Sequence, residues 1–212
     1  MRLSYIFLVL VFGFIVSCKS DKSEDETVDV EHSAPSSQEN IETLFDQIVF
    51  ASEIENKLLK ELEICNPSQS DLTNHDDPAC HPKFFKFFTY VDGKKINDAF
   101  ALQIKSRVQG FPLRRLLVFE REAGDLVKVN GFVANLIGKR KSETKHDDLV
   151  LRFSDNVGGG EIAFYNCLYQ WEDKHYVFKK VEQINDANLK VEFQDSMNTV
   201  ISQILEENKM VF

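Results

Sequence analysis

The side chains with the greatest capacity for chemistry gather in the polar stretch 65–82. Histidine nitrogens and aspartate oxygens in this stretch could bind Zn²⁺ or another divalent cation, and a cysteine thiolate could join them. The spacing matches no strong zinc signature, and two of these residues directly precede prolines, as turn residues do. The sequence therefore favours a solvated loop without a metal, and it indicates no cofactor. The residues are His75, Asp76, Asp77, Cys80 and His81.

Two other places combine a histidine with carboxylates, the groups that general acid–base catalysis uses. They are residues 146–148, His-Asp-Asp, and residues 172–175, Glu-Asp-Lys-His. Both fall at predicted turns, where charged residues are ordinary, and the chain has no G-x-S-x-G motif. Cys167 has no identifiable base in the sequence. The patterns favour a non-catalytic domain, and a hydrolase that uses these loop-end residues is the alternative.

Two features suit ligand binding. Residues 139–141, Lys-Arg-Lys, form a basic spot that could meet an anionic partner, although a solvated loop explains it more simply. Trp171 and three tyrosines near it could form a face that stacks on sugar rings, or they could belong to the aromatic core of a sheet. The tyrosines are Tyr165, Tyr169 and Tyr176.

The N-terminus carries the most specific motif of the chain. Residues 3–16 are almost entirely apolar and would span about 21 Å as a helix, short of a hydrocarbon core of roughly 30 Å. This favours a cleaved signal peptide over a membrane-spanning helix. The apolar run ends in Ile15-Val16-Ser17-Cys18, which resembles the lipobox of bacterial lipoproteins.

The resemblance implies that residues 1–17 are a signal peptide, and that Cys18 becomes the N-terminus and carries fatty acyl chains such as palmitate. The acidic stretch 19–26 is similar to the tails of surface-exported lipoproteins of Bacteroidetes. We therefore expect a protein anchored in the cell envelope, at the outer membrane, on its periplasmic or surface side. An ordinary secretory signal is the alternative, but Ile15 stands where such signals prefer a small residue.

The composition divides the mature chain into a tether and one domain. Residues 18–38 are acidic and hold no aromatic residue, as flexible tethers do. Residues 39–212 have the size of a single globular domain. The formal net charge of −9 argues against nucleic acid as a partner. The expected partners are the membrane, through the lipid anchor, and an envelope protein or a glycan.

The compartment that the lipobox implies affects the oxidation state expected for the other cysteines. In an oxidising envelope, Cys65 and Cys80, which flank a polar loop, are expected to form a disulfide. The rival is metal binding by Cys80 with the histidines and aspartates of the loop, which requires a free thiolate. Cys167 is then a buried free thiol.

Hydrophobic spacing predicts the elements that would position these residues. Three- and four-residue steps predict helices over residues 39–63 and 196–208. Between them, alternating runs and turn residues predict antiparallel strands, with residues 138–145 as a basic connection. We therefore expect an α+β fold, an antiparallel β-meander with an N-terminal and a C-terminal helix packed on it. The strands are expected at residues 84–91, 100–104, 116–119, 126–133, 149–153, 162–171 and 176–181.

Four phenylalanines in residues 84–88 are too apolar to stay in water, and we expect most of them to be buried between sheet and helix. The sequence as a whole favours a lipid-anchored cell-envelope protein with a non-catalytic binding or interaction domain. An envelope hydrolase is the alternative.

Overall fold

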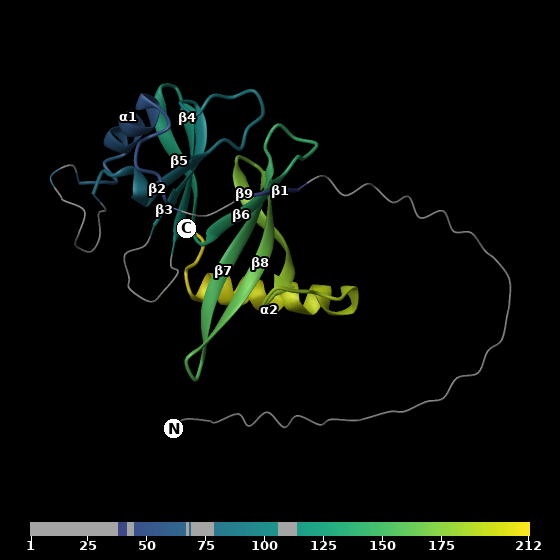
Figure 1. Ribbon diagram of the computed structural model, residues 1–212. Coiled ribbons are helices and arrows are strands. Elements are labelled where there is room, and N and C mark those ends of the chain that lie inside the picture. Colours follow the sequence, from purple (N-terminus) through teal and green to yellow (C-terminus); the bar gives the residue numbers. More distant parts are fainter. Residues whose placement is uncertain (1–37, 42–44, 67, 69–78, 106–113) are drawn as a thin grey trace, which may run out of the picture. The chain divides into compact units, whose positions relative to one another are not determined.

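The computed structural model describes residues 38–41, 45–66, 68, 79–105 and 114–212 (Figure 1). These residues form two antiparallel β-sheets and two α-helices, α1 (Glu53–Glu61) and α2 (Gln194–Glu207). The predicted α+β class is confirmed. The signal-like segment, Cys18, most of the proposed tether, and His75, Asp76 and Asp77 lie outside the described residues.

The strands form a meander that is divided between two sheets. The strand order is β2-β3-β4-β5 in one sheet and β1-β6-β7-β8-β9-β10 in the other. A single residue, Ala134, separates β5 from β6, so the chain passes directly from the first sheet to the second. The bounds are β1 (Gln38–Asn40), β2 (Phe85–Phe88), β3 (Ala99–Ile104), β4 (Arg115–Glu122), β5 (Asp125–Val133), β6 (Asn135–Arg140), β7 (Asp148–Gly158), β8 (Glu161–Glu172), β9 (His175–Ile184) and β10 (Ala187–Asn188).

Two-residue turns close the long hairpins of the six-stranded sheet. Asp173 and Lys174 connect β8 to β9 with φ values of 45° and 71°, and Gly159 and Gly160 connect β7 to β8 with 62° and 84°. Positive φ at both positions is typical of a type I′ turn, whose twist matches that of the flanking strands. The turn residues noted in the sequence therefore do set the hairpins locally.

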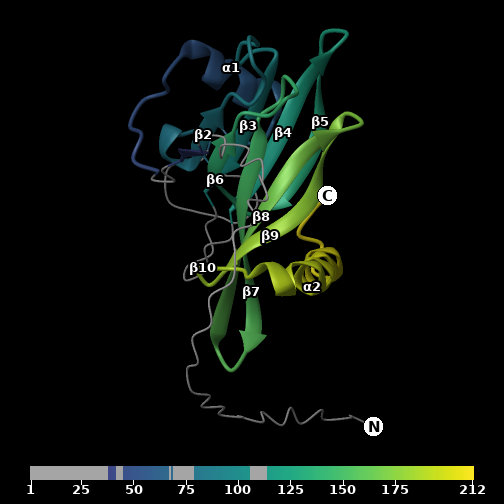
Figure 2. The same cartoon turned by 90° about the vertical axis from the view of Figure 1, so that its right-hand side faces the viewer.

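Two hydrophobic cores lie on the two faces of the four-stranded sheet. On one face, Ala101 and Val118 pack towards Leu151 of the six-stranded sheet, and Ile201 and Leu205 of α2 complete this core. On the other face, Phe100 and Leu102 pack with Leu58 and Leu59 of α1. Figures 1 and 2 both show α1 beside the four-stranded sheet and α2 beside the six-stranded sheet.

Two buried amide side chains join the sheets. Gln103 of β3 donates to the carbonyl oxygen of Ala134 (2.9 Å) and accepts from the N–H of Leu136 (2.9 Å). Asn130 of β5 donates to the carbonyl oxygen of Tyr176 (3.2 Å) and accepts from its N–H (2.6 Å), as a neighbouring strand would. These amides satisfy backbone groups where the two sheets do not pair directly.

The expected N-terminal helix over residues 39–63 was too long. The helix begins at Glu53, and β1 pairs instead with β6, placing Gln38 opposite Arg140. Ile48 and Val49, which the helical pattern included or adjoined, are 82% and 70% exposed. The spacing of apolar residues was misleading because a strand partner from far along the chain outweighed local helical preference. The same pairing turns the start of the expected connection 138–145 into the end of β6.

The phenylalanine-rich stretch divides between the two cores. Phe84 and Phe85 are buried with 8% and 1% exposure. Phe87 is partly buried against the α1 side of the sheet, and Phe88 is partly buried against the inter-sheet core. Two of the four rings are therefore buried and two are partly covered. Phe87 and Phe88 face different cores because successive strand residues point to opposite faces of the sheet.

Candidate functional site

The metal-like stretch of the sequence does not assemble a metal site in the part that is described. The sulfur atoms of Cys65 and Cys80 lie 2.04 Å apart, at disulfide distance. A disulfide between them would leave Cys80 no thiolate for a metal. Nδ1 of His81 accepts a hydrogen bond from the N–H of Lys83 (3.3 Å) and caps the 3₁₀ turn Pro82–Phe84. Among the described residues, no three His, Cys, Asp or Glu side chains could hold a metal ion together.

The loop-end residues 146–148 lie where the two sheets meet. Nε2 of His146 lies 3.0 Å from Oε1 of Glu120, a β4 residue that sequence reasoning did not single out. The His146 ring stacks on Trp171 with the ring centres 3.9 Å apart, and the Tyr90 hydroxyl donates to the same Glu120 oxygen at 3.3 Å. His146 and Glu120 thus form an acid–base pair that also links the two sheets, and the other groups restrict access to it.

The aromatic residues considered for sugar stacking belong to the protein interior. Tyr165, Tyr169 and Tyr176 are 4%, 1% and 2% exposed. The Tyr176 hydroxyl donates to the carbonyl oxygen of Asp147 at 2.8 Å, and burial raises the pKa of that hydroxyl well above its usual value. A carbohydrate-stacking face made of these rings is therefore ruled out, and they form the aromatic core that the sequence left open.

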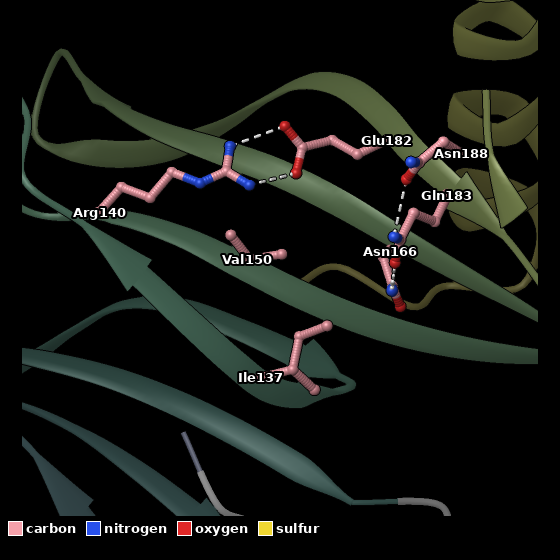
Figure 3. Close-up of a pocket in the computed structure, with 7 residues that line it drawn as sticks. All are labelled: Ile137, Arg140, Val150, Asn166, Glu182, Gln183 and Asn188. Atoms are coloured by element: carbon pink, nitrogen blue, oxygen red, sulfur yellow. Dashed lines mark hydrogen bonds and ion pairs between the residues drawn. The ribbon is translucent and has the colours of Figure 1, made fainter. Parts of the chain in front are cut away.

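A polar pocket lies on the opposite face of the six-stranded sheet (Figure 3). Its volume is about 380 Å³, near the lower end of the range of roughly 300–1,000 Å³ for small-molecule sites. Five strands contribute to it, because alternate strand residues point away from the inter-sheet core. We call this site the sheet pocket, and its described lining is Ile137, Arg140, Val150, Asn166, Glu182, Gln183 and Asn188.

Irregularities in strand pairing bring extra side chains to the sheet pocket. The register of β8 and β9 shifts between Asn166 and Cys167, which allows the consecutive residues Glu182 and Gln183 both to line the pocket. A second shift, between Leu136 and Gly138, lies at Ile137. Bulges of this kind are enriched beside functional sites because they re-aim side chains.

An ion pair forms one side of the pocket. The two Nη atoms of Arg140 donate to the two carboxylate oxygens of Glu182 at 2.7 and 2.6 Å, as the dashed lines in Figure 3 show. Burial alone would raise the pKa of the Glu182 carboxyl, but the hydrogen bonds and charges of Arg140 and Lys180 outweigh it and lower that pKa below its usual value. Both groups are therefore charged at neutral pH and neutralise each other.

A row of three amides forms the other side. Nδ2 of Asn166 donates to Oε1 of Gln183, and Nε2 of Gln183 donates to Oδ1 of Asn188 at 2.9 Å. Asn166 is 5% exposed, and its Oδ1 atom has no hydrogen-bond partner among the described residues. A buried acceptor without a donor is costly, so it indicates a position where a ligand N–H or O–H would bind favourably.

A second pocket of about 390 Å³ lies beside β1 and β2. Its lining includes the partly buried Phe87 and Phe88, and Lys139, which donates to the carbonyl oxygen of Thr89 at 3.0 Å. Lys139 also contacts Asp147 at 3.7 Å. These two interactions give Lys139, which belongs to the basic spot, a structural role.

Arg140 is the one residue of the described pocket lining that the sequence pattern had indicated, as part of the basic spot. Asn166 carried a usable signal, because it and Gln170 are the two amides in the run 162–171, which is otherwise apolar on both faces. The remaining described lining residues are ordinary polar or aliphatic strand residues, and only the pairing of strands brings them together.

Comparisons with known proteins identify no relative of this chain. No protein-family model matches the chain, and no curated protein or solved structure matches it at a significant level. Within the described ranges, no helix has the length and apolarity needed to cross a membrane.

Proposed function

We propose that the protein is a lipid-anchored cell-envelope protein whose domain binds a small ligand in the sheet pocket without transforming it. The anchor rests on the lipobox-like residues 15–18. The binding role rests on one observation above all, the buried Asn166 oxygen without a partner in a pocket lined by several convergent polar groups. The two strand bulges at the pocket support the same role.

The lining of the sheet pocket suits binding better than catalysis. The described part of the lining contains no serine, cysteine or histidine, and its carboxylate is engaged by Arg140. Cys167 is fully buried, and burial raises the pKa of its thiol, so it is no thiolate nucleophile at neutral pH. A nucleophile with an adjacent base, which acyl or glycosyl transfer would need, is missing from the described lining.

A hydrolase is the second candidate, favoured by the 3.0 Å contact between His146 and Glu120. Such a pair could exchange a proton with a substrate that reached it. Trp171 covers one face of the His146 ring, and the side chains of His146 and Glu120 are 17% and 14% exposed. These contacts favour a structural role for the pair, so binding without chemistry remains the preferred function.

The lipid anchor predicts a modified mature N-terminus. Mass spectrometry of the protein from its native envelope should show a chain that begins at Cys18 and carries two or three acyl chains, which give stable membrane attachment where one chain is marginal. Cys18→Ala should abolish cleavage, while Cys167→Ala should leave it intact. An unprocessed Met1 in the envelope fraction would contradict the anchor.

The sheet pocket predicts a bound small molecule. Native mass spectrometry of the mature protein in detergent should reveal a ligand-bound species, which the double variant Arg140→Ala/Glu182→Ala should lose. This variant removes both charges together and leaves neither one unpaired. The matched control is Arg152→Ala/Asp186→Ala, which removes an ion pair of 2.9 Å outside the pocket lining and should keep the ligand.

Two results of this experiment would change the conclusion. Ligand retained by the Arg140→Ala/Glu182→Ala variant, or no ligand in the unaltered protein, would remove the sheet pocket as the binding site. If the unaltered protein releases the ligand in a cleaved form and the His146→Gln variant does not, the result would favour the hydrolase.

A further inference from the structure

The two charged residues of the described pocket lining, Arg140 and Glu182, pair with each other. Arg140 and Glu182 satisfy each other through two hydrogen bonds, and Nζ of Lys180 lies 3.3 Å from the same carboxylate. A charged ligand would have to compete with the two-point pairing of Arg140 and Glu182 at a largely buried position, which is unfavourable. The pocket therefore suits an uncharged ligand.

The amide row offers hydrogen bonds of both kinds. In the observed orientation, Asn166 ends the row with a buried acceptor, and the exposed Asn188 ends it with the N–H groups of its Nδ2. Reversing all three amides would exchange the two ends but would still leave one acceptor and one donor. Each amide nitrogen carries two N–H groups, and the hydrogen bonds within the row use one on Asn166 and one on Gln183. Donors therefore also lie along the row near the Asn166 acceptor, and this end of the row is complementary to a ligand group that has an N–H or O–H beside a carbonyl or hydroxyl oxygen.

Aliphatic side chains complete the sheet pocket. Ile137 and the almost fully buried Val150 line it together with the polar groups, and the described lining contains no aromatic ring. Figure 3 shows both of them beside the ion pair and the amide row. Methyl and methylene surface here favours a small apolar group on the ligand over a flat aromatic one.

We propose that the ligand of the sheet pocket is a neutral N-acetylated sugar. Its acetamido group combines an N–H for Oδ1 of Asn166, a carbonyl oxygen for the amide N–H groups of the row, and a methyl group for Ile137 and Val150. This inference rests on the proposed binding function and assigns the chemical class of its ligand.

The decisive comparison uses two disaccharides that differ in the acetamido group. Isothermal titration calorimetry of the mature protein in lipid nanodiscs should give N,N′-diacetylchitobiose at least about tenfold tighter binding than cellobiose, which has hydroxyls in place of both acetamido groups. Tenfold corresponds to roughly 1.4 kcal/mol, the value of a typical hydrogen bond to a buried group.

Variants of the amide row test whether this row causes the preference for diacetylchitobiose over cellobiose. Asn166→Ala should weaken diacetylchitobiose binding by about tenfold or more and should abolish the preference over cellobiose. Asn188→Ala is a second variant at an exposed position, where the fold is not at risk, and it should also reduce the preference. Asn97→Ala, at an exposed site in the β2–β3 connection, is the matched control and should bind like the unaltered protein.

The outcomes separate the ligand class from the binding function. Equal affinity for both disaccharides, or a preference that survives both pocket variants, would overturn the acetamido assignment while ligand binding in the pocket stood. Failure of both disaccharides to bind would overturn the sugar assignment. The proposed function itself fails only if native mass spectrometry also finds no pocket-dependent ligand.

Discussion

Replacing Gln103 by methionine should lower the free energy of unfolding by about 2–4 kcal/mol, although the two side chains have similar length and volume. Gln103 is 1% exposed and binds the N–H of Leu136 and the carbonyl oxygen of Ala134, where the chain crosses between sheets. Methionine would fill the space but leave both backbone groups buried without partners. Each such group costs roughly 1–3 kcal/mol.

Chemical unfolding monitored by tryptophan fluorescence and by circular dichroism would measure this loss. The matched control is Gln203→Met on the exposed face of α2, where Gln203 bonds only to Glu207 and the change should stay within about 0.5 kcal/mol. Equal stabilities of the Gln103 and Gln203 variants would show that the buried amide does not hold the sheets together.

Removing both Cys65 and Cys80 should lower the free energy of unfolding by about 3 kcal/mol, the chain-entropy value for a loop near 15 residues. The bond would tie the end of the α1 segment to the start of the phenylalanine-rich strand, across residues 66–79, which are rich in turn formers. A loop of this composition gains little stability from burial, so a covalent link is the effective constraint.

The test compares unfolding of the unaltered protein with that of Cys65→Ala/Cys80→Ala, each with and without reductant. Reductant should destabilise the first and leave the double variant unchanged, because Cys167 is a buried free thiol. Peptide mapping without reduction should show one linked peptide. Two free thiols there, with one bound zinc ion per chain, would instead support the rival metal site of Cys80 with His75, Asp76 and His81.

Local sequence signals predicted most strands and the second helix well. The run expected at residues 162–171 is β8, Glu161–Glu172, and the helix expected at 196–208 is α2, Gln194–Glu207. These elements were predictable because alternation, helical spacing and turn residues act over a few residues. The same signals failed at residues 39–41 and 45–52, where apolar spacing resembled a helix. At residues 39 and 40 the long-range pairing of β1 with β6 prevailed.

The candidate site could be predicted only in fragments. Lys139-Arg140-Lys141 was visible as a basic run, but its residues separate: Arg140 binds Glu182 in the pocket, while Lys139 binds Thr89 and Asp147. His146 was visible beside Asp147, yet its carboxylate partner is Glu120 from the other sheet. The pairs Arg140–Glu182, Lys139–Thr89 and His146–Glu120 each join residues at least 26 positions apart, beyond the reach of spacing arguments.

The sequence by itself determined the α+β class, the hairpin turns, and the strongly apolar strands, because short-range sterics and hydrophobic periodicity specify them. It also supplied the lipobox-like motif on which the proposed anchor rests. Only the tertiary structure decided that the meander divides into two sheets, that the tyrosines are core residues, and that seven of the described residues, from five strands, line a pocket. Those features depend on strand register and bulges, which are set by the packing of distant segments and leave no local pattern in the chain.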